Sequence, residues 1–276
     1  MKEHYFDTNV YSHIHNRVGV TDKQVARLYA AVRADKIRIL TSSVVVEETI
    51  SALLSAEKEG LARLKLIRKL AKRKRIIKLH PDLLEDDIKS YARGEKPRSH
   101  FMAPPPRFIQ VFVDHGGDHL RILRQIAKET QQQIQAFRNE MNEKYNQLLR
   151  PLAAQIIRQN QQQSFADYWN ELSIPFAEQL ADKARVLPEC QVRGMAGLLE
   201  VRSVKLATMA QLSLGYANTY ERGAVERGDS RDMQHAVLAS AVKTFVTDDP
   251  RLARVLTRMP ILDFESINLP TLLERL

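Results

Sequence analysis

Residues 228–256 read GDSRDMQHAVLASAVKTFVTDDPRLARVL, and this stretch decides the expected fold. Apolar residues at three- and four-residue steps predict a helix over 232–242, and KTFVT predicts a short buried strand. Asp249 at an N-cap and Pro250 at the first helical position then predict a second helix over DPRLARVLTR. A helix, a strand and a helix in succession are typical of an α/β fold.

The N-terminal part of the chain repeats this alternation. HYFDTNV predicts a strand that ends at Asp7, and the segment after it predicts a helix capped by Thr21 or Asp22. IRILTSS predicts a second strand, Ser42 or Ser43 would cap the helix VVVEETISALLSA, and RIIKL predicts a third strand. Together with a last strand at PILDF, these elements predict a parallel sheet with right-handed crossovers.

The middle of the chain has a different pattern. The segment 93–107 is rich in proline and polar residues and predicts a loop. A narrow apolar seam then predicts a long amphipathic helix at Leu120, Leu123, Ala127, Thr130, Ile134, Phe137, Met141 and Leu148. Pro151 would end this helix, and LAAQIIRQNQQQ, FADYWNEL and the run before the aspartates predict further helices. We therefore expect one α/β domain from residues 1–92 and 223–276, with a mostly α-helical insertion at 93–222.

Length and composition place the chain in a broad class. Its 276 residues are 44% hydrophobic, which suffices for a large core. No apolar run is long enough to span a bilayer, and the N-terminus lacks a secretory pattern, so we expect a cytoplasmic protein without a membrane partner. Cys190 is the single cysteine, which excludes an internal disulfide and a cysteine-rich zinc site.

The net charge of +9 favours polyanionic partners such as nucleic acid. The positive charge is concentrated at 63–78, RLKLIRKLAKRKRIIK, where apolar residues at helical spacing predict a helix with one buried stripe and a basic outer face. The candidate phosphate-binding residues there are Arg68, Lys69, Lys72, Arg73, Lys74 and Arg75. A solvated charged face is the alternative interpretation.

Acidic residues are expected at the carboxyl ends of the strands, where parallel sheets bind ligands. Asp7 closes the first strand, Glu47 and Glu48 lie early in the helix after the second, Asp232 starts a helix, and Asp249 follows the FVT strand. Clustered carboxylates suit Mg²⁺ or Mn²⁺, which can activate water and stabilise charge on a phosphate. An acidic metal site on a basic chain is consistent with cleavage of a nucleic acid backbone. Asp7 alone could instead form a turn by bonding its own backbone.

Four segments carry a resemblance to a known family. YFDTNV, TSSVVVEETISAL, DMQHAVLASAV and TFVTDDPRL resemble, in order, the four acid-bearing motifs of PIN-domain nucleases, and they cover roughly the first 90 and last 50 residues. The resemblance implies a PIN-like three-layer domain with a central parallel sheet and a metal-dependent ribonuclease activity. It also implies that Asp7, Glu48, Asp232 and Asp249 hold Mg²⁺ or Mn²⁺, with Asn9 orienting the first of them.

The resemblance assigns further residues and partners. Thr247 would support the site from its strand, and Glu47 would be exposed or assist Glu48. Asp229 and Asp248 would either support the ligands or serve as N-cap and surface acids. The helical insertion between the second and third acids departs from compact members of the family. It could cover the site, contact structured RNA or form a homodimer, and a toxin role would require an antitoxin protein.

Two rival functions differ in class from the nuclease. A non-catalytic RNA-binding or assembly module with an idle acidic site would bind RNA through the basic helix and the insertion, without product. Haloacid-dehalogenase-like phosphatases also begin with an aspartate after the first strand, but they need another acid where this chain has Asn9. The sequence contains no glycine-rich phosphate loop, which disfavours an ATPase.

Histidines and aromatic residues supply weaker signals. His235 lies among apolar neighbours, so we expect a core or supporting histidine rather than a general base. His13 and His15 are expected on the surface or on the substrate side, and DHGGDH at 114–119 is expected to form a strand-to-helix turn. Tyr168 and Trp169 are expected in a helix seam, with stacking on bases as the alternative.

Overall fold

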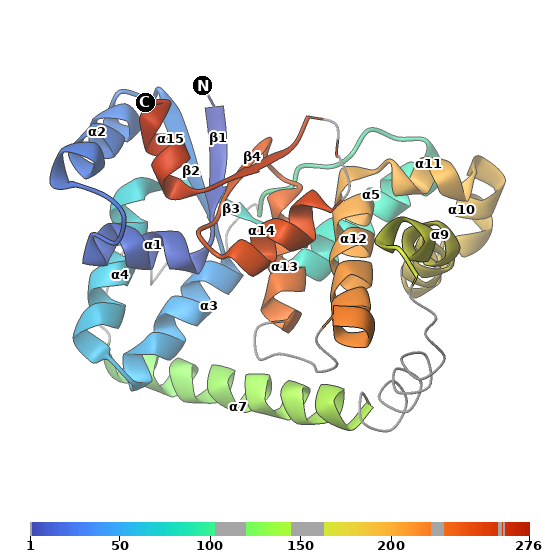
Figure 1. Ribbon diagram of the computed structural model, residues 1–276, viewed down its shortest axis with the longest axis horizontal. Helices are drawn as coiled ribbons and strands as arrows, with labels where there is room; N and C mark the ends of the chain where they lie inside the picture. Colours follow the sequence, from blue (N-terminus) through green and yellow to red (C-terminus); the bar gives the residue numbers. More distant parts are fainter. Residues whose placement is uncertain (1, 103–119, 145–162, 222–228, 259–260, 262) are drawn as a thin grey trace.

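The computed structural model describes residues 2–102, 120–144, 163–221, 229–258, 261 and 263–276 (Figure 1). In this part of the chain, helices surround a five-stranded parallel sheet with the strand order β3-β2-β1-β4-β5. The strands are β1 (Lys2–Phe6), β2 (Ile37–Ser42), β3 (Ala71–Ile77), β4 (Thr244–Val246) and β5 (Glu265–Ile267). The expected α/β fold with a parallel sheet is confirmed.

Strand β1 lies at the centre of the sheet, between β2 and β4. Tyr5 and Phe6 are fully buried, as expected for a strand covered on both faces. Tyr5 is paired with Leu40 of β2 on one side and with Phe245 of β4 on the other. The strand order changes direction beside β1, so the carboxyl ends of β1 and β4 form the topological switch point where such sheets bind ligands.

The first half of the chain supplies helices on both sides of the sheet. They are α1 (Thr8–Asn16), α2 (Asp22–Arg33), α3 (Ser43–Ser51), η1 (Ala52–Leu54), α4 (Glu57–Leu70) and α5 (His80–Arg93). The expected caps form, because Thr21 makes a capping box with Gln24 and Ser42 accepts a hydrogen bond from the Val45 amide. In Figure 1, α1, α2 and α4 lie on one side of β1, and α5 and α13 lie on the other.

The basic segment 63–78 is not one helix, which corrects the sequence prediction. Helix α4 ends at Leu70, and Ala71–Ile77 forms β3 beside β2. Pairing with β2 buries Ile76 and Ile77, and this tertiary gain outweighs the helix propensity of the lysines and arginines before them. The candidate RNA-binding residues 72–75 therefore belong to a strand, and their side chains lie outside what the structure describes.

The middle of the chain is helical where the structure describes it. Its helices are α7 (Leu120–Lys144), α9 (Phe165–Lys183), α10 (Leu187–Arg193), α11 (Met195–Leu199), α12 (Arg202–Tyr216) and the π-helical turn η3 (Ala217–Glu221). Helix α7 packs against α3 and η1, burying Leu123 and Ala127. Figure 1 shows α7 on the same side as the carboxyl ends of the strands. The predictions for 103–119, Leu148 and Pro151 lie outside the described residues.

The last part of the chain returns to the sheet. It contains α13 (Asp229–Ala239), β4, α14 (Pro250–Thr257), β5 and α15 (Leu269–Glu274). Helix α14 has Asp249 at its N-cap and Pro250 at its first position, as predicted. Helix α13 begins at Asp229 rather than at Asp232, and β5 is Glu265–Ile267 rather than PILDF. A left-handed turn at Asp263, with φ of 56°, precludes an extended strand there.

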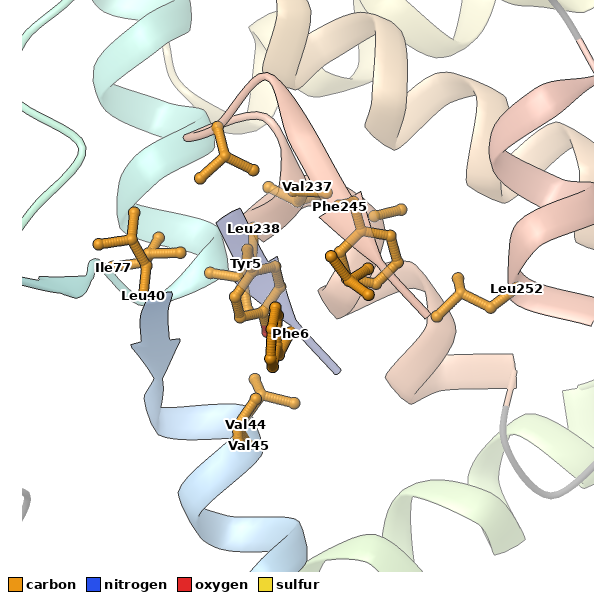
Figure 2. Packing of buried hydrophobic residues seen from close by; sticks show 14 of the residues in the cluster. Tyr5, Phe6, Leu40, Val44, Val45, Ile77, Val237, Leu238, Phe245 and Leu252 are labelled. Atoms are coloured by element: carbon orange, nitrogen blue, oxygen red, sulfur yellow. The ribbon is translucent and has the colours of Figure 1, made fainter. Parts of the chain in front are cut away.

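One hydrophobic cluster of described residues joins the sheet to the helices of the middle part. Figure 2 shows its centre, with residues of the strands packed against α3, α13 and α14: Tyr5, Phe6, Leu40, Val44, Val45, Ile77, Val237, Leu238, Phe245 and Leu252. Leu123, Trp169 and Leu206 belong to the same cluster, and Tyr168 packs against it. The domain boundaries stay a prediction. None of the helices in the described residues is long and apolar enough to cross a membrane.

Candidate functional site

Asp7 lies at the switch point, directly after β1. Its backbone amide donates to the Val246 carbonyl of β4 at 3.1 Å, which holds the ends of the two strands together. Its carboxylate caps α1, because Oδ1 accepts from the Val10 amide at 2.9 Å, and Oδ2 accepts from the Thr247 hydroxyl. The side chain is thus fixed from two elements, and Asp7 is only 2% exposed.

His235 of α13 connects this place to Glu48 of α3. Its Nε2 lies 3.1 Å from Glu48 Oε2, which also accepts from the Thr8 hydroxyl. Its Nδ1 lies 2.8 Å from the Tyr5 hydroxyl, which lies 2.9 Å from Ser42 Oγ. Because a carboxylate only accepts hydrogen bonds, Nε2 donates to Glu48. His235 is buried, as the sequence predicted, and its ring is held at both nitrogens.

The charges at this place are strongly coupled. Burial raises the pKa of Asp7 from 3.8 to about 6, against the charge of His235 and the Thr247 hydrogen bond, which lower it. Burial also favours neutral Glu48, but the charge and hydrogen bond of His235 outweigh it and lower the pKa of Glu48. Burial favours the neutral imidazole of His235, but Glu48, Asp7 and Asp232 together raise the pKa of His235. Three carboxylates therefore act on one buried imidazole.

Asp232 is the third of these carboxylates, and it lies on α13 one turn before His235. The helix brings both residues to the same face, since they are three residues apart. Asp232 Oδ2 forms an ion pair with Arg251 Nη2 at 2.7 Å. The Asp232 side chain is only 8% exposed, whereas that of Arg251 is 28% exposed. We call Asp7, Glu48 and Asp232 the carboxylate site.

Asp249, the fourth predicted ligand, has a structural task. Its Oδ1 accepts from the amides of Arg251 and Leu252 at 2.8 and 3.2 Å and so caps α14. Its own amide donates to the Thr247 hydroxyl at 3.0 Å. Because that hydroxyl donates in turn to Asp7, Asp249 adjoins the carboxylate site through Thr247.

The predicted supporting residues are placed in different ways. Asn9 is exposed, and Asp7 is held by Val10 and Thr247. Glu47 Oε2 accepts from Arg231 Nη1 at 3.1 Å. Asp229 is the first residue of α13, and its side chain is outside the described part.

Asp248 joins three elements next to the site. Its Oδ2 lies 2.7 Å from Nδ1 of His13 in α1, and its Oδ1 accepts from the Leu269 amide of α15 at 2.8 Å. His13 and His15 are both partly exposed, in agreement with the surface position expected for them. The second histidine-rich segment, 114–119, is outside the described residues.

Helix α4, which carries the first of the predicted phosphate-binding residues, packs against α1 and α3. Arg68 is partly exposed and Lys69 is exposed, and the Lys69 ammonium lies 3.9 Å from the ring centre of Tyr29 on α2. This contact joins the outer faces of α2 and α4. Arg27 and Arg33 of α2 are also exposed, so both helices contribute positive charge to the surface.

The oxygen donors of the carboxylate site are of the type that a hard divalent cation binds, although each carboxylate already has a side-chain partner in the protein. In the described part of the chain, no three His, Cys, Asp or Glu side chains lie together as a ready metal site. His235 and Arg251 instead hold Glu48 and Asp232. A set of three carboxylates with oxygen donors matches the preference of Mg²⁺ and Mn²⁺, and the raised pKa of Asp7 reflects a buried acid that a cation would stabilise.

Two residues of the site were missed by sequence reasoning. Tyr5 is predicted only as a strand residue, although it precedes Asp7 by two residues and the extended backbone continues from β1 through Asp7, which puts both on the same side. Arg251 follows the capping Asp249 by two residues in DDPRL, and that spacing in the first turn of a helix was the available signal. Neither residue could be paired with its partner from spacing alone.

Fold and site together define an α/β protein with a buried carboxylate site at the switch point of a parallel sheet. Comparison of the chain with protein-family models, with curated proteins and with solved structures found no match.

Proposed function

We propose that this protein is a PIN-like, metal-dependent endoribonuclease. The observation that supports the proposal best is the convergence of Asp7, Glu48 and Asp232 on the buried His235. These acids come from segments far apart in the sequence and meet at the switch point, where a parallel sheet binds its ligand. Capping is a task of Asp249 and of Asp7, whereas Glu48 and Asp232 lie inside α3 and α13 and cap no helix.

Asp7, Glu48 and Asp232 would hold Mg²⁺ or Mn²⁺, with Asp249 at their margin. When bound, such an ion supplies an activated water and stabilises the charge that develops on a phosphodiester. The protein positions these carboxylates in advance: Thr247 holds Asp7, and His235 holds Glu48. His235 is itself held by Tyr5, so we assign it a positioning role.

RNA is the proposed substrate because the motif resemblance implies it and the chain carries a net charge of +9. Exposed cations on α2 and α4 would contact the phosphate backbone. The same resemblance allows a toxin with an antitoxin partner or an RNA-processing enzyme. The helices of the middle part would then cover the site, contact structured RNA or form a homodimer.

The test is cleavage of a mixed pool of single-stranded and folded RNAs with Mn²⁺, with Mg²⁺ and with EDTA. Wild-type protein is compared with Asp7→Asn and Asp232→Asn, which remove one charge each. Asp263→Asn is the matched control, because Asp263 is 63% exposed and follows α14 in a left-handed turn that asparagine also adopts. We expect metal-dependent product from the wild type and the control, and a loss of at least a hundredfold in both site variants.

Full activity in the site variants would contradict the proposal. RNA binding that is salt-sensitive and unchanged by EDTA, without product under either metal, would instead support the non-catalytic binding module. The ion pairs that already occupy Glu48 and Asp232 are the observation that favours this second function.

A further inference from the structure

The ion pair between Arg251 and Asp232 affects how the proposed site would bind a metal ion. A buried carboxylate needs a partner, and Arg251 Nη2 provides it at 2.7 Å from Asp232 Oδ2. A metal ion held by the carboxylate site would need that same carboxylate. The guanidinium and the ion therefore compete for Asp232.

We propose that Arg251 occupies Asp232 in the metal-free protein, yields it to the divalent cation, and then binds a phosphate of the RNA. This inference rests on the proposed function. It assigns to Arg251 a metal-exchange role and a substrate-binding role in the same site. Both roles use the positive charge of the Arg251 guanidinium, which already lies beside Asp232.

Arg251 is the partner that can leave. Its side chain is 28% exposed, compared with 4% for His235, the partner of Glu48. His235 is also held at its second nitrogen by the Tyr5 hydroxyl, so its ring cannot turn away without breaking that bond too. Moving His235 away from Glu48 would therefore leave buried ring nitrogens without hydrogen-bond partners, which is costly. The flexible stem of an arginine can move its head into solvent at a smaller cost.

The backbone of Arg251 keeps it close to the site after release. Its amide donates to Asp249 Oδ1 at 2.8 Å in the first turn of α14. Asp249 is joined to Asp7 through the Thr247 hydroxyl, so this end of the helix is attached to the carboxylate site. A guanidinium anchored there can bind a phosphate through two parallel hydrogen bonds.

The first measurement is Mn²⁺ binding to the whole chain. The paramagnetic resonance signal of the free ion reports how much Mn²⁺ is unbound at each point of the titration. We expect Arg251→Gln to bind Mn²⁺ at least fivefold more tightly than the wild type, because the competing charge is gone. Arg251→Lys keeps the charge and should stay within twofold. Arg254→Gln is the matched control, since Arg254 is exposed on the same helix and its loss changes the net charge equally.

The second measurement is RNA affinity by fluorescence anisotropy, using a single-stranded RNA with phosphorothioate linkages that resist cleavage, verified as intact afterwards. In EDTA, Asp232 holds Arg251, so Arg251→Gln should change the affinity less than twofold. In Mn²⁺ the same variant should bind RNA about tenfold more weakly than the wild type. The Arg254→Gln control should change the affinity equally in both conditions.

The outcomes separate this inference from the proposed function. If the wild type binds Mn²⁺ and Asp232→Asn does not, but Arg251→Gln has unchanged or weaker Mn²⁺ affinity, the exchange role of Arg251 is refuted and the nuclease stands. If neither the wild type nor Arg251→Gln binds Mn²⁺, the metal-dependent nuclease is refuted together with the inference. Thermal unfolding of each variant confirms that the compared proteins are folded.

Discussion

The Tyr5 hydroxyl and Nδ1 of His235 lie 2.8 Å apart, although the two residues are separated by 230 positions in the sequence. Nε2 of the same ring faces Glu48. The hydroxyl also lies 2.9 Å from Ser42 Oγ, which caps α3, the helix that carries Glu48. Tyr5 of the central strand therefore fixes the His235 ring and also contacts the cap of α3, the helix that carries Glu48.

Removal of this hydroxyl in Tyr5→Phe should destabilise the protein by about 1–3 kcal/mol, because Ser42 and His235 would lose a buried hydrogen-bond partner. Urea unfolding at pH 7 measures the change. Tyr29→Phe is the control, since Tyr29 is only partly buried, and its variant should differ from wild type by less than about 0.5 kcal/mol. Equal stability of the two variants would contradict the role of Tyr5.

Helix α7 should contribute to the core that supports the site. Leu123 is 1% exposed, whereas its neighbour Ile122 is 52% exposed. Leu123→Ala should therefore cost about 2–5 kcal/mol, and Ile122→Ala less than about 0.5 kcal/mol. Chemical denaturation of both variants tests the packing of α7 on α3. A small loss in Leu123→Ala would show that α7 is not held against α3 in solution.

Local sequence signals predicted most elements of the fold. The N-cap at Asp249 with Pro250 after it marked the start of α14, and the first strand ends at Phe6, one residue before the predicted end at Asp7. Both depend on residues that are neighbours in the chain. The helix predicted over 63–78 was wrong after Leu70, whereas the strand predicted at RIIKL overlaps β3 at its C-terminal end. Pairing with β2 extends this strand back to Ala71, and the basic residues there do not encode that pairing.

The acids of the candidate site could be predicted from the sequence, but their hydrogen-bond and ion-pair partners could not. The motifs singled out Asp7, Glu48 and Asp232, whose charges do meet at His235. Which cation faces which acid depends on side chains that the fold brings together from distant segments. The pairing of Asp232 with Arg251 is therefore a result of the structure alone.

The raised pKa of Asp7 predicts a pH-dependent stability. The folded-state pKa of about 6 lies above the ordinary value of 3.8, so folding favours the protonated carboxyl. Well below pH 3.8 both states are protonated, and burial of Asp7 carries no ionisation cost. As the pH rises from 3.8 to about 6, the unfolded state ionises first, and a cost of up to about 3 kcal/mol develops.

Asp7→Asn removes this cost and keeps an N-cap for α1. The variant should therefore gain stability relative to the wild type as the pH rises, by about 1–3 kcal/mol between pH 4.5 and 7.5. Loss of Asp7 also removes an interaction that raises the pKa of His235, which weakens the variant at low pH and acts in the same direction. Urea unfolding at three pH values tests this, and a pH-independent difference between the two proteins would refute it.

Mn²⁺ should stabilise the folded protein against heat, since an ion that binds only the folded state shifts the unfolding equilibrium. At one hundred times its dissociation constant the ion adds about 2.7 kcal/mol, which corresponds to a rise in Tm of about 5 °C or more for a chain of this size. EDTA should reverse the rise. Asp232→Asn should abolish it, and the exposed Asp263→Asn should retain it. An undiminished rise in Asp232→Asn would place the ion outside the carboxylate site.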